Sequence, residues 1–115
     1  MIETRLGEFE EVMLLLVGIL GDENSYAFRI AEEFESQTGR SVSIGAVHST
    51  LDRLEGKGFL KSEMGKPTTE RGGRRKRIFI ITAIGKKILR ESRDFKVALW
   101  QQYPAFSTSK LSFGE

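Results

Sequence analysis

Residues 42–60, VSIGAVHSTLDRLEGKGFL, decide the expected fold of this chain. Ser41 or Ser43 can accept a hydrogen bond from the first turn of a helix, as N-cap residues do. Apolar residues follow at the spacing of one helical face, at Ile44, Val47, Leu51 and Leu54. The residues between them are small or polar, and Gly56 and Gly58 end the segment. The stretch therefore predicts a helix with one buried face and one open face.

Two helices are predicted before this segment. The apolar run from Phe9 to Leu20 follows acidic residues, which favour a helix N-terminus, and Gly21 ends it. Ser25 is the expected N-cap of a second helix, in which apolar side chains recur every four residues. These side chains are Tyr26, Ile30 and Phe34. Gly39 ends the second helix, so a turn of about four residues, 39–42, joins it to the third.

A β hairpin and a long helix are predicted after it. Residues 59–64 are expected to form a first strand, and the β-branched run from Ile78 to Ile81 a second. The loop between them, Gly65 to Arg75, is rich in glycine, threonine and basic residues. Thr82 caps a last helix that Pro104 ends. The apolar positions of that helix are Ile84, Ile88, Leu89, Phe95, Leu99 and Tyr103.

The order helix, helix, helix, strand, loop, strand, helix predicts a mainly α protein with a small β hairpin, in the α+β class. Three short helices followed by a hairpin make a winged helix-turn-helix. We expect residues 1–82 to form this winged-helix unit and residues 83–103 to form a C-terminal dimerisation helix of the same domain. Residues 104–115 are expected to be a flexible tail.

Charge is unevenly distributed along the chain, although its net value is only +2. Residues 1–39 hold nine acidic residues and two arginines, whereas residues 40–93 hold five acidic residues and fourteen basic ones. Such asymmetry is typical of a domain that presents a nucleic-acid surface on one part. A basic segment solvated at the surface, without a partner, explains the charge equally well.

The third helix and the hairpin loop carry the candidate DNA-binding residues. On the helix, small side chains let the backbone enter a groove, and hydroxyls or an arginine can reach base edges or phosphates. Residues 71–77 hold five basic residues beside two glycines, as in a wing that follows the DNA backbone or enters a narrow minor groove. The expected contacts are Arg40, Ser43, Gly45, Ala46, His48, Ser49, Thr50, Arg53, Arg71, Arg74, Arg75 and Lys76. Each feature alone also fits an ordinary amphipathic helix or a solvated charge run, and their coincidence carries the prediction.

Composition argues against several other classes. The chain has no cysteine, so disulfides and thiolate metal sites are excluded, and a cytoplasmic location is expected. His48 is the sole histidine, so no metal site and no cofactor are expected. The longest apolar run, residues 12–20, is too short to span a membrane, and no secretion signal is expected at the N-terminus. No catalytic motif is recognised, and no enzyme activity is expected.

Segments across residues 6–95 resemble the PadR-like family of transcriptional regulators. Residues 6–10, LGEFE, resemble the opening of the family's first helix, and residues 26–30, YAFRI, the start of its second. Residues 42–60 resemble its recognition helix, and residues 77–85, RIFIITAIG, its second wing strand and the cap of its dimer helix. The resemblance implies a dimeric repressor that binds a near-palindromic operator and is released by an effector.

The chain departs from the family pattern at several positions. His48 stands where the family usually has a Tyr that commonly contacts DNA, Ser49 where it often has Pro, and Ala27 where it usually has Gly. Some members bind flat aromatic effectors at the dimer interface through a Trp of the last helix. Trp100 is displaced along the helix from that position and is the candidate effector-binding residue. The expected dimerisation residues are Ile84, Ile88, Phe95, Leu99, Trp100 and Tyr103.

The predicted function is sequence-specific binding of double-stranded DNA by a homodimer. The homodimer is predicted to be a repressor that a small aromatic effector releases from DNA. The alternative is a winged helix used for protein contacts, without DNA reading. The basic residues 71–77 argue against this alternative, because the cores of protein interfaces are usually depleted in charge. The expected partners are therefore DNA, a second copy of the chain and an effector, with no membrane.

Overall fold

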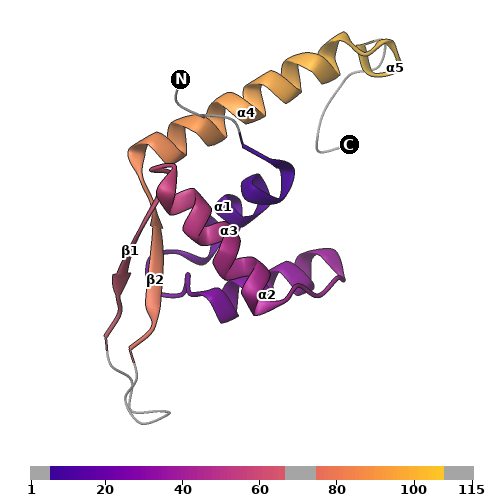
Figure 1. The fold of residues 1–115 in the computed structure, drawn as a ribbon. Coiled ribbons are helices and arrows are strands. Elements are labelled where there is room, and N and C mark those ends of the chain that lie inside the picture. The colour runs from indigo at the N-terminus through magenta and orange to yellow at the C-terminus, as the bar shows by residue number, and fades with distance from the viewer. Residues whose placement is uncertain (1–5, 67–74, 108–115) are drawn as a thin grey trace.

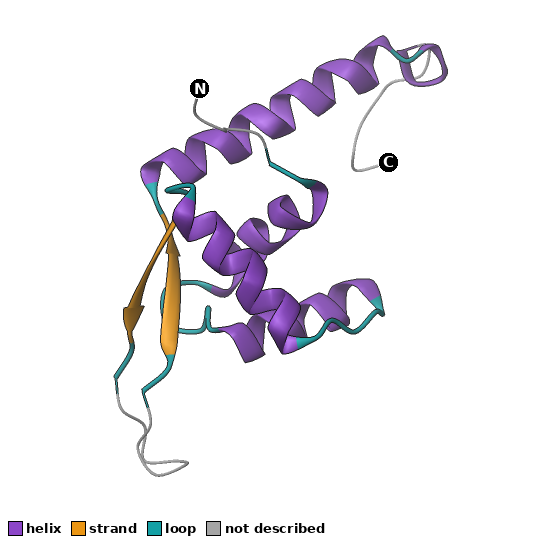
Figure 2. Ribbon diagram, in the orientation of Figure 1, coloured by secondary structure: helices purple, strands orange, loops and turns teal. Residues whose placement is uncertain are grey.

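The computed structural model describes residues 6–66 and 75–107 of the chain (Figure 1). In chain order its elements are α1 (Glu8–Leu20), α2 (Ala27–Thr38), α3 (Ile44–Gly56), β1 (Leu60–Met64), β2 (Arg77–Ile81), α4 (Ala83–Gln102) and α5 (Pro104–Ser107). Figure 2 shows the first three helices gathered beside a two-stranded antiparallel hairpin. This order confirms the prediction of a mainly helical winged helix with a small hairpin.

The core forms where α1, α2 and α3 pack together and against the hairpin. Its buried apolar side chains are Met13, Leu14, Leu16, Val17, Ala27, Ile30, Phe34, Val47, Leu51, Leu54, Phe59, Leu60, Ile78 and Phe79. Each helix contributes residues at the three- and four-residue spacing of a single face, as the sequence predicts. Ile44 is an exception to the predicted stripe, because it lies at the first position of α3 and is 41% exposed.

The connection between α1 and α2 is tied to the hairpin by Ser25. The prediction that Ser25 caps α2 is wrong, because Tyr26 holds the N-cap position and makes no side-chain cap bond. Ser25 is fully buried, and its hydroxyl donates a hydrogen bond to the carbonyl oxygen of Phe79. Its own carbonyl accepts from the Phe79 N–H at 3.0 Å. A polar residue that could have capped a helix therefore joins β2 to the helical layer.

The hairpin begins directly after α3. Gly58 adopts a φ of +84°, the left-handed region that favours glycine, and so turns the chain from the helix into β1. In the paired strands Leu60 lies opposite Ile81, and Met64 lies opposite Arg77. The strand ends that face the loop are therefore polar or exposed, while the ends near the helices are apolar. Residues 67–74 lie outside the described part of the chain.

The junction between β2 and α4 is held by Thr82. Its hydroxyl accepts a hydrogen bond from the Gly85 N–H at 3.0 Å, which confirms the predicted cap, and donates to the Gly58 carbonyl at 2.6 Å. The Thr82 N–H donates to the Phe59 carbonyl at 3.1 Å. Gly85 is the one buried residue of α4, and a Cβ built on it would lie 2.2 Å from the Phe59 carbonyl oxygen. The start of α4 therefore presses directly on the backbone that enters β1.

Beyond this junction Ile88 and Leu89 of α4 still pack against the core, and the C-terminal half of the helix extends past the other helices (Figure 1). The helix ends at Gln102, before Pro104, as predicted. Pro104–Ser107, the first turn of the segment expected to be a flexible tail, forms α5. Proline suits the first turn of a helix, where the missing N–H would have no partner within the helix. Residues 108–115 lie outside the described part. None of the helices in the described part combines the length and the hydropathy of a membrane span.

Replacing Gly85 by alanine is expected to lower the free energy of unfolding by about 2 kcal/mol, because the new Cβ overlaps a backbone oxygen that cannot move without opening the junction. Gly45→Ala is the matched control, because a Cβ at Gly45 meets no atom within 4 Å and alanine favours the helix by about 0.5–1 kcal/mol. Urea unfolding followed by circular dichroism, at one protein concentration, measures both. Equal stabilities of the two variants would contradict the tight junction.

Candidate nucleic-acid interface

The exposed face of α3 is the first part of the candidate interface. Gly45, His48, Ser49 and Asp52 are all exposed, and their spacing of three and four residues places them on one side of the helix. The opposite side is anchored by Val47, Leu51 and Leu54, which are fully buried. The predicted residues Gly45, His48 and Ser49 are therefore brought together on a single accessible surface. Asp52 shares this face and is missing from the sequence prediction, although its position seven residues after Gly45 was sufficient to place it there.

The N-terminus of α3 is capped by Ser43. Its hydroxyl accepts a hydrogen bond from the Ala46 N–H at 3.0 Å, so the serine itself is exposed but engaged in the cap. Ala46 is half-buried and lies at the edge of the exposed face. Of these two predicted contact residues, Ser43 therefore caps the helix, and Ala46 adds little to its exposed face.

The turn before α3 holds Arg40. Gly39 takes a φ of +75° and ends α2, and the Arg40 N–H donates to the Thr38 hydroxyl at 3.0 Å. The Arg40 guanidinium lies 5.6 Å from the centre of the Phe34 ring. Arg40 remains exposed, so its charge is held beside the N-terminus of α3 and accessible to solvent.

Thr50 and Arg53 differ from their predicted placement. Thr50 is 3% exposed and belongs to the buried side of α3, so the prediction that it lies on the accessible face is wrong. Arg53 donates from Nε to Glu10 at 3.1 Å and from a terminal nitrogen to the Thr50 hydroxyl at 3.4 Å. Its side chain is still 53% exposed. Arg53 therefore holds α3 to α1 and also leaves part of its guanidinium open to solvent.

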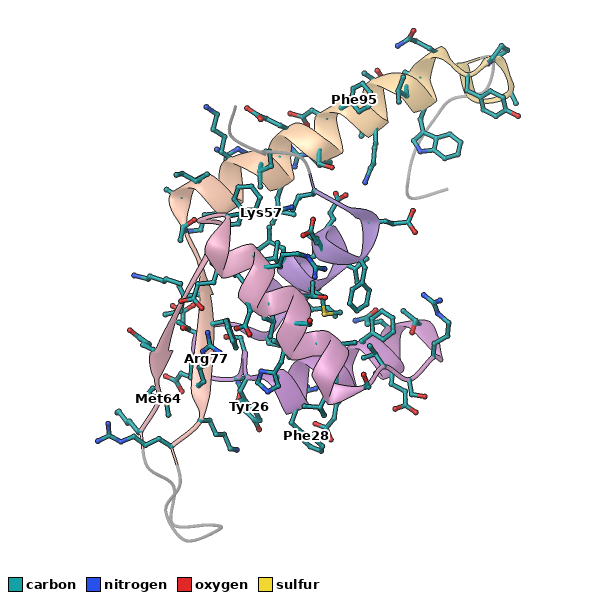
Figure 3. All side chains as sticks on the ribbon, viewed as in Figure 1. Tyr26, Phe28, Lys57, Met64, Arg77 and Phe95 are labelled. Carbon is teal, nitrogen blue, oxygen red and sulfur yellow. The ribbon has the colours of Figure 1, made fainter. Side chains whose placement is uncertain are left out.

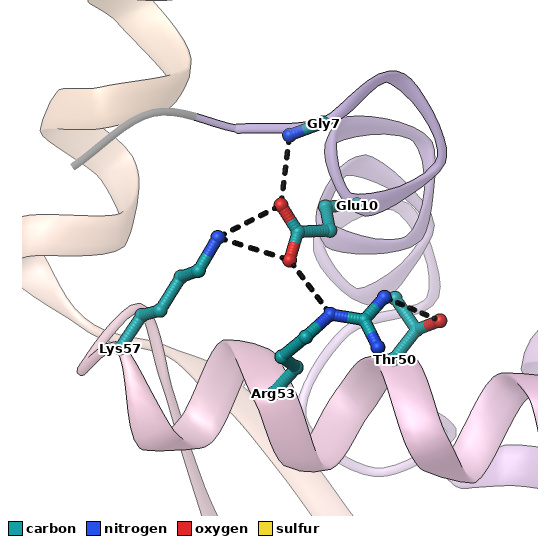
Figure 4. Close-up of polar contacts among 5 residues, drawn as sticks. All are labelled: Gly7, Glu10, Thr50, Arg53 and Lys57. Carbon is teal, nitrogen blue, oxygen red and sulfur yellow. Dashed lines mark hydrogen bonds and ion pairs between the residues drawn. The ribbon is translucent and has the colours of Figure 1, made fainter. Parts of the chain in front are cut away.

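Glu10 is the centre of this contact between helices (Figure 4). Its carboxylate accepts from the Gly7 N–H at 2.7 Å, from Lys57 Nζ at 3.0 Å and from Arg53 Nε at 3.1 Å. Burial by itself raises the pKa of Glu10, but the hydrogen bonds from Gly7, Lys57 and Arg53 outweigh it and hold the pKa below its ordinary value of 4.5. The carboxylate is therefore charged at neutral pH and joins the start of α1 to the C-terminal end of α3.

The base of the wing forms the second part of the candidate interface. Arg75 is exposed, whereas Lys76 is half-buried and its Nζ lies 4.1 Å from the centre of the Tyr26 ring. The predicted contacts Arg71 and Arg74 lie outside the described residues. The described base of the wing is therefore positioned against the start of α2 and adds one exposed cation beside it.

Arg77 connects the wing to α3 (Figure 3). Its guanidinium lies 3.1 Å from the Asp52 carboxylate and 2.6 Å from that of Glu55, and Nε donates to the Ser62 hydroxyl at 3.2 Å. The same guanidinium stacks over the Phe79 ring, 4.7 Å from its centre. This network is missing from the sequence prediction, because ion pairs between segments 22 or more residues apart leave no local signal.

A separate apolar surface lies on α4. Ile84, Phe95, Leu99, Trp100 and Tyr103 are between 45% and 65% exposed, whereas Ile88 is half-buried against the core. Trp100 and Tyr103 pack edge to face, with ring centres 6.1 Å apart. Five of the six predicted dimerisation residues are therefore accessible in the single chain. Within residues 6–66 and 75–107 no group of three or more metal-ligating side chains is found.

Replacing Glu10 by glutamine is expected to lower the free energy of unfolding by about 2 kcal/mol at pH 7, because Lys57 and Arg53 then lose their partner charge. Since the folded pKa is depressed, this stabilisation is present above the ordinary pKa of 4.5 and is lost as the pH falls through the folded value. The difference in stability between wild type and Glu10→Gln should therefore shrink below about pH 4.5. Urea titrations from pH 3 to pH 7 measure this difference, with Glu32→Gln at an exposed site as the control. A difference that is constant with pH would contradict the role of the Glu10 charge.

The chain is similar to known regulators both in sequence and in fold. A scan against protein-family models matches residues 16–91 to the transcriptional regulator PadR-like family. A search of curated proteins found no match. The matched region runs from α1 through α3 and the hairpin into α4, and so includes every described element of the candidate interface.

Solved structures of similar fold include several regulators. A PadR-like transcription factor from Bacteroides fragilis aligns with a TM-score of 0.67 and 21% identity, over 84% of this chain and 87% of that chain. A transcriptional regulator from Clostridium thermocellum aligns with a TM-score of 0.64 and 23% identity, over 84% and 90% of the two chains. RosR from H. salinarum aligns with a TM-score of 0.65 and 22% identity, over 83% and 77%.

At these identities the solved structures show a shared fold. The family match covers more than half of the chain and agrees with the resemblance found in its sequence. Its members are regulators of transcription and not enzymes, and membership implies binding to DNA. This chain belongs to the PadR-like family of transcriptional regulators.

Proposed function

We propose that two copies of this chain pair through α4 and act as a repressor that binds a near-palindromic operator. The observation that carries the proposal is the presence, on one small chain, of two separate accessible surfaces of opposite character. One is the polar open face of α3, and the other is the apolar side of α4. A monomer would leave the second surface in water, whereas a dimer would bury it and pair two copies of the first.

Reading of DNA is assigned to α3. Gly45 and Ser49 have small side chains, so the backbone of α3 can approach base edges closely in a major groove. His48 lies between them on the same face and carries ring nitrogens that can donate or accept. Arg40 in the turn before α3 and Arg75 at the base of the wing are exposed and would contact phosphates. Phosphate contacts set the register and orientation of the protein more than they select sequence.

Pairing of two copies is assigned to α4. Phe95, Leu99 and Tyr103 follow one another at a spacing of four residues and form a continuous exposed row. Leu15 and Ile19 of α1 are also exposed, at 45% and 62%, and can extend the interface. A helix of this kind, with one buried residue along 20, gains its stability from packing against a partner. Two-fold symmetry then places the two α3 helices in successive major grooves, about 10 base pairs apart or a multiple of it.

Release by a small aromatic effector is assigned to the groove between α1 and α4. A cavity of about 450 Å³ lies there, lined by the apolar residues Leu15, Leu89, Val97 and Trp100 and by the charged residues Glu11, Arg90, Arg93 and Lys96. This volume falls within the range of small-molecule sites. Because the cavity adjoins the proposed dimer surface, a bound molecule can change how the two copies pair and so change the distance between the two reading helices.

Ser49→Glu is expected to weaken DNA binding by at least about tenfold, because a carboxylate on the open face of α3 meets the phosphates and the base acceptors. Ser36→Glu, the same change at an exposed position of α2, is the control and should bind as wild type does. Fluorescence-anisotropy titrations measure both, against the duplex upstream of the chain's own gene and a random duplex at two salt concentrations. If both variants bind as wild type does, or if wild type does not bind at low salt, the result favours a winged helix used for protein contacts.

Phe95→Glu is expected to convert the dimer to a monomer, because it places a charge in the centre of the proposed apolar interface. Lys86→Glu is the control, since Lys86 is exposed and lies nine residues before Phe95, half a turn away around the helix. Light scattering after size-exclusion chromatography gives the mass of each variant, and circular dichroism reports that the fold is kept. A wild-type chain that elutes as a monomer would contradict pairing through α4.

A further inference from the structure

Asp52 is an acidic residue in an unusual place, because a helix that approaches phosphates is expected to avoid negative charge. It shares the open face of α3 with Gly45, His48 and Ser49, and its side chain is 58% exposed. A carboxylate there weakens the electrostatic attraction to DNA phosphates, which does not depend on sequence. Its presence on this face therefore points to a role in selecting bases.

Arg77 holds this carboxylate in position from the wing. One terminal nitrogen of the guanidinium lies 3.1 Å from Asp52 Oδ1, and the other lies 2.6 Å from Glu55 Oε1. The guanidinium is itself fixed by its bond to Ser62 and by its stacking on Phe79, which is fully buried. The ion pair partly neutralises Asp52 and limits its rotamers, so less conformational freedom is lost when the side chain meets a base.

A carboxylate accepts hydrogen bonds and donates none, which restricts the base it can read. In the major groove cytosine offers the N4 amino group as its donor, whereas guanine and thymine offer acceptors at O6, N7 and O4. Adenine offers an amino group beside the N7 acceptor, which repels a carboxylate. The side chain therefore favours cytosine over the other three bases.

We propose that Asp52 is a specificity-determining residue that reads cytosine in each half-site, and that Arg77 is its positioning residue. The inference rests on the proposed function, in which α3 enters the major groove. Asp52 supplies the base contact, and Arg77 supplies the orientation without itself touching DNA. Glu55, the other carboxylate bound to Arg77, lies one turn further along α3 and is less accessible, with a side chain 33% exposed against 58% for Asp52.

The test begins with the wild-type chain and a pool of random duplexes, from which a preferred site is selected. Affinity is then measured for duplexes that carry each of the four base pairs at each position of that site. The variants are Asp52→Asn, Arg77→Gln, the double variant and Glu55→Gln. The last is the matched control, because it removes the other ion pair of Arg77 by the same acid-to-amide change.

Asp52→Asn is expected to lose a preference for cytosine of about tenfold or more at one position of each half-site, with the other positions unchanged. Arg77→Gln should weaken the preference at the same position, and the double variant should show no further loss there. Glu55→Gln should keep the preference. Circular dichroism of each variant separates these effects from unfolding.

Two results would overturn the proposal. If Asp52→Asn strengthens binding to all duplexes equally, the carboxylate only repels DNA and reads nothing. If the preference at every position is unchanged, Asp52 does not contact a base. Failure of the wild-type chain to select any duplex is a separate result, seen before any variant is made, and it would overturn the proposed function together with this inference.

Discussion

One buried carboxylate, that of Glu10, sets the relation between the first helix and the recognition helix. It accepts the Gly7 N–H within its own helix cap and bonds to Lys57 and Arg53 on α3. Apolar packing of Val47, Leu51 and Leu54 fixes which side of α3 faces the core, because a rotation would expose these buried side chains. The directional hydrogen bonds to Glu10 add to this packing and hold the orientation in which Gly45, His48 and Ser49 face outward.

Ion pairs within the chain reduce the number of basic residues that are available to bind DNA. The excess of basic residues in the middle of the chain is typical of a nucleic-acid surface, yet three of these cations are bound by internal carboxylates. Arg53 and Lys57 pair with Glu10, and Arg77 pairs with Asp52 and Glu55. In the described part of the wing and turn, Arg40 and Arg75 are the exposed cations of the predicted set. The surface that can meet phosphates is therefore smaller than the count of basic residues implies.

Much of the fold could be predicted from the sequence, because its local signals agree with the tertiary structure. The spacing of apolar residues placed α1, α2 and α3, the β-branched run placed β2, and Thr82 proved to be the cap of α4. The errors occur where a tertiary contact overrides a local preference. Ser25 has the composition of a cap but bonds to Phe79 on a strand 54 residues away. Thr50 is polar yet buried, because the Arg53 guanidinium bonds to its hydroxyl at the margin of the core.

The candidate site was predictable to a lesser degree for the same reason. Helical spacing alone places Gly45, His48 and Ser49 together, and it also places Asp52 with them. No local rule reveals that Arg77 reaches Asp52 from the hairpin, since that contact depends on how the strands cross the end of α3. Residues on one helix face can be grouped from sequence, whereas the partners that orient them come from the fold.

The tight contact at Gly85 holds the start of α4, so a small rotation there displaces the far end of the helix. The helix has 20 residues and is therefore about 30 Å long; its first turn is fixed where Gly85 meets the Phe59 carbonyl, and Lys96 further along pairs with Glu11 of α1. A rotation of about 7° at that end displaces the far end by nearly 4 Å, slightly more than the 3.4 Å rise of one base pair. In the proposed dimer, small changes in packing around this glycine would therefore be amplified along α4 into a change of operator spacing.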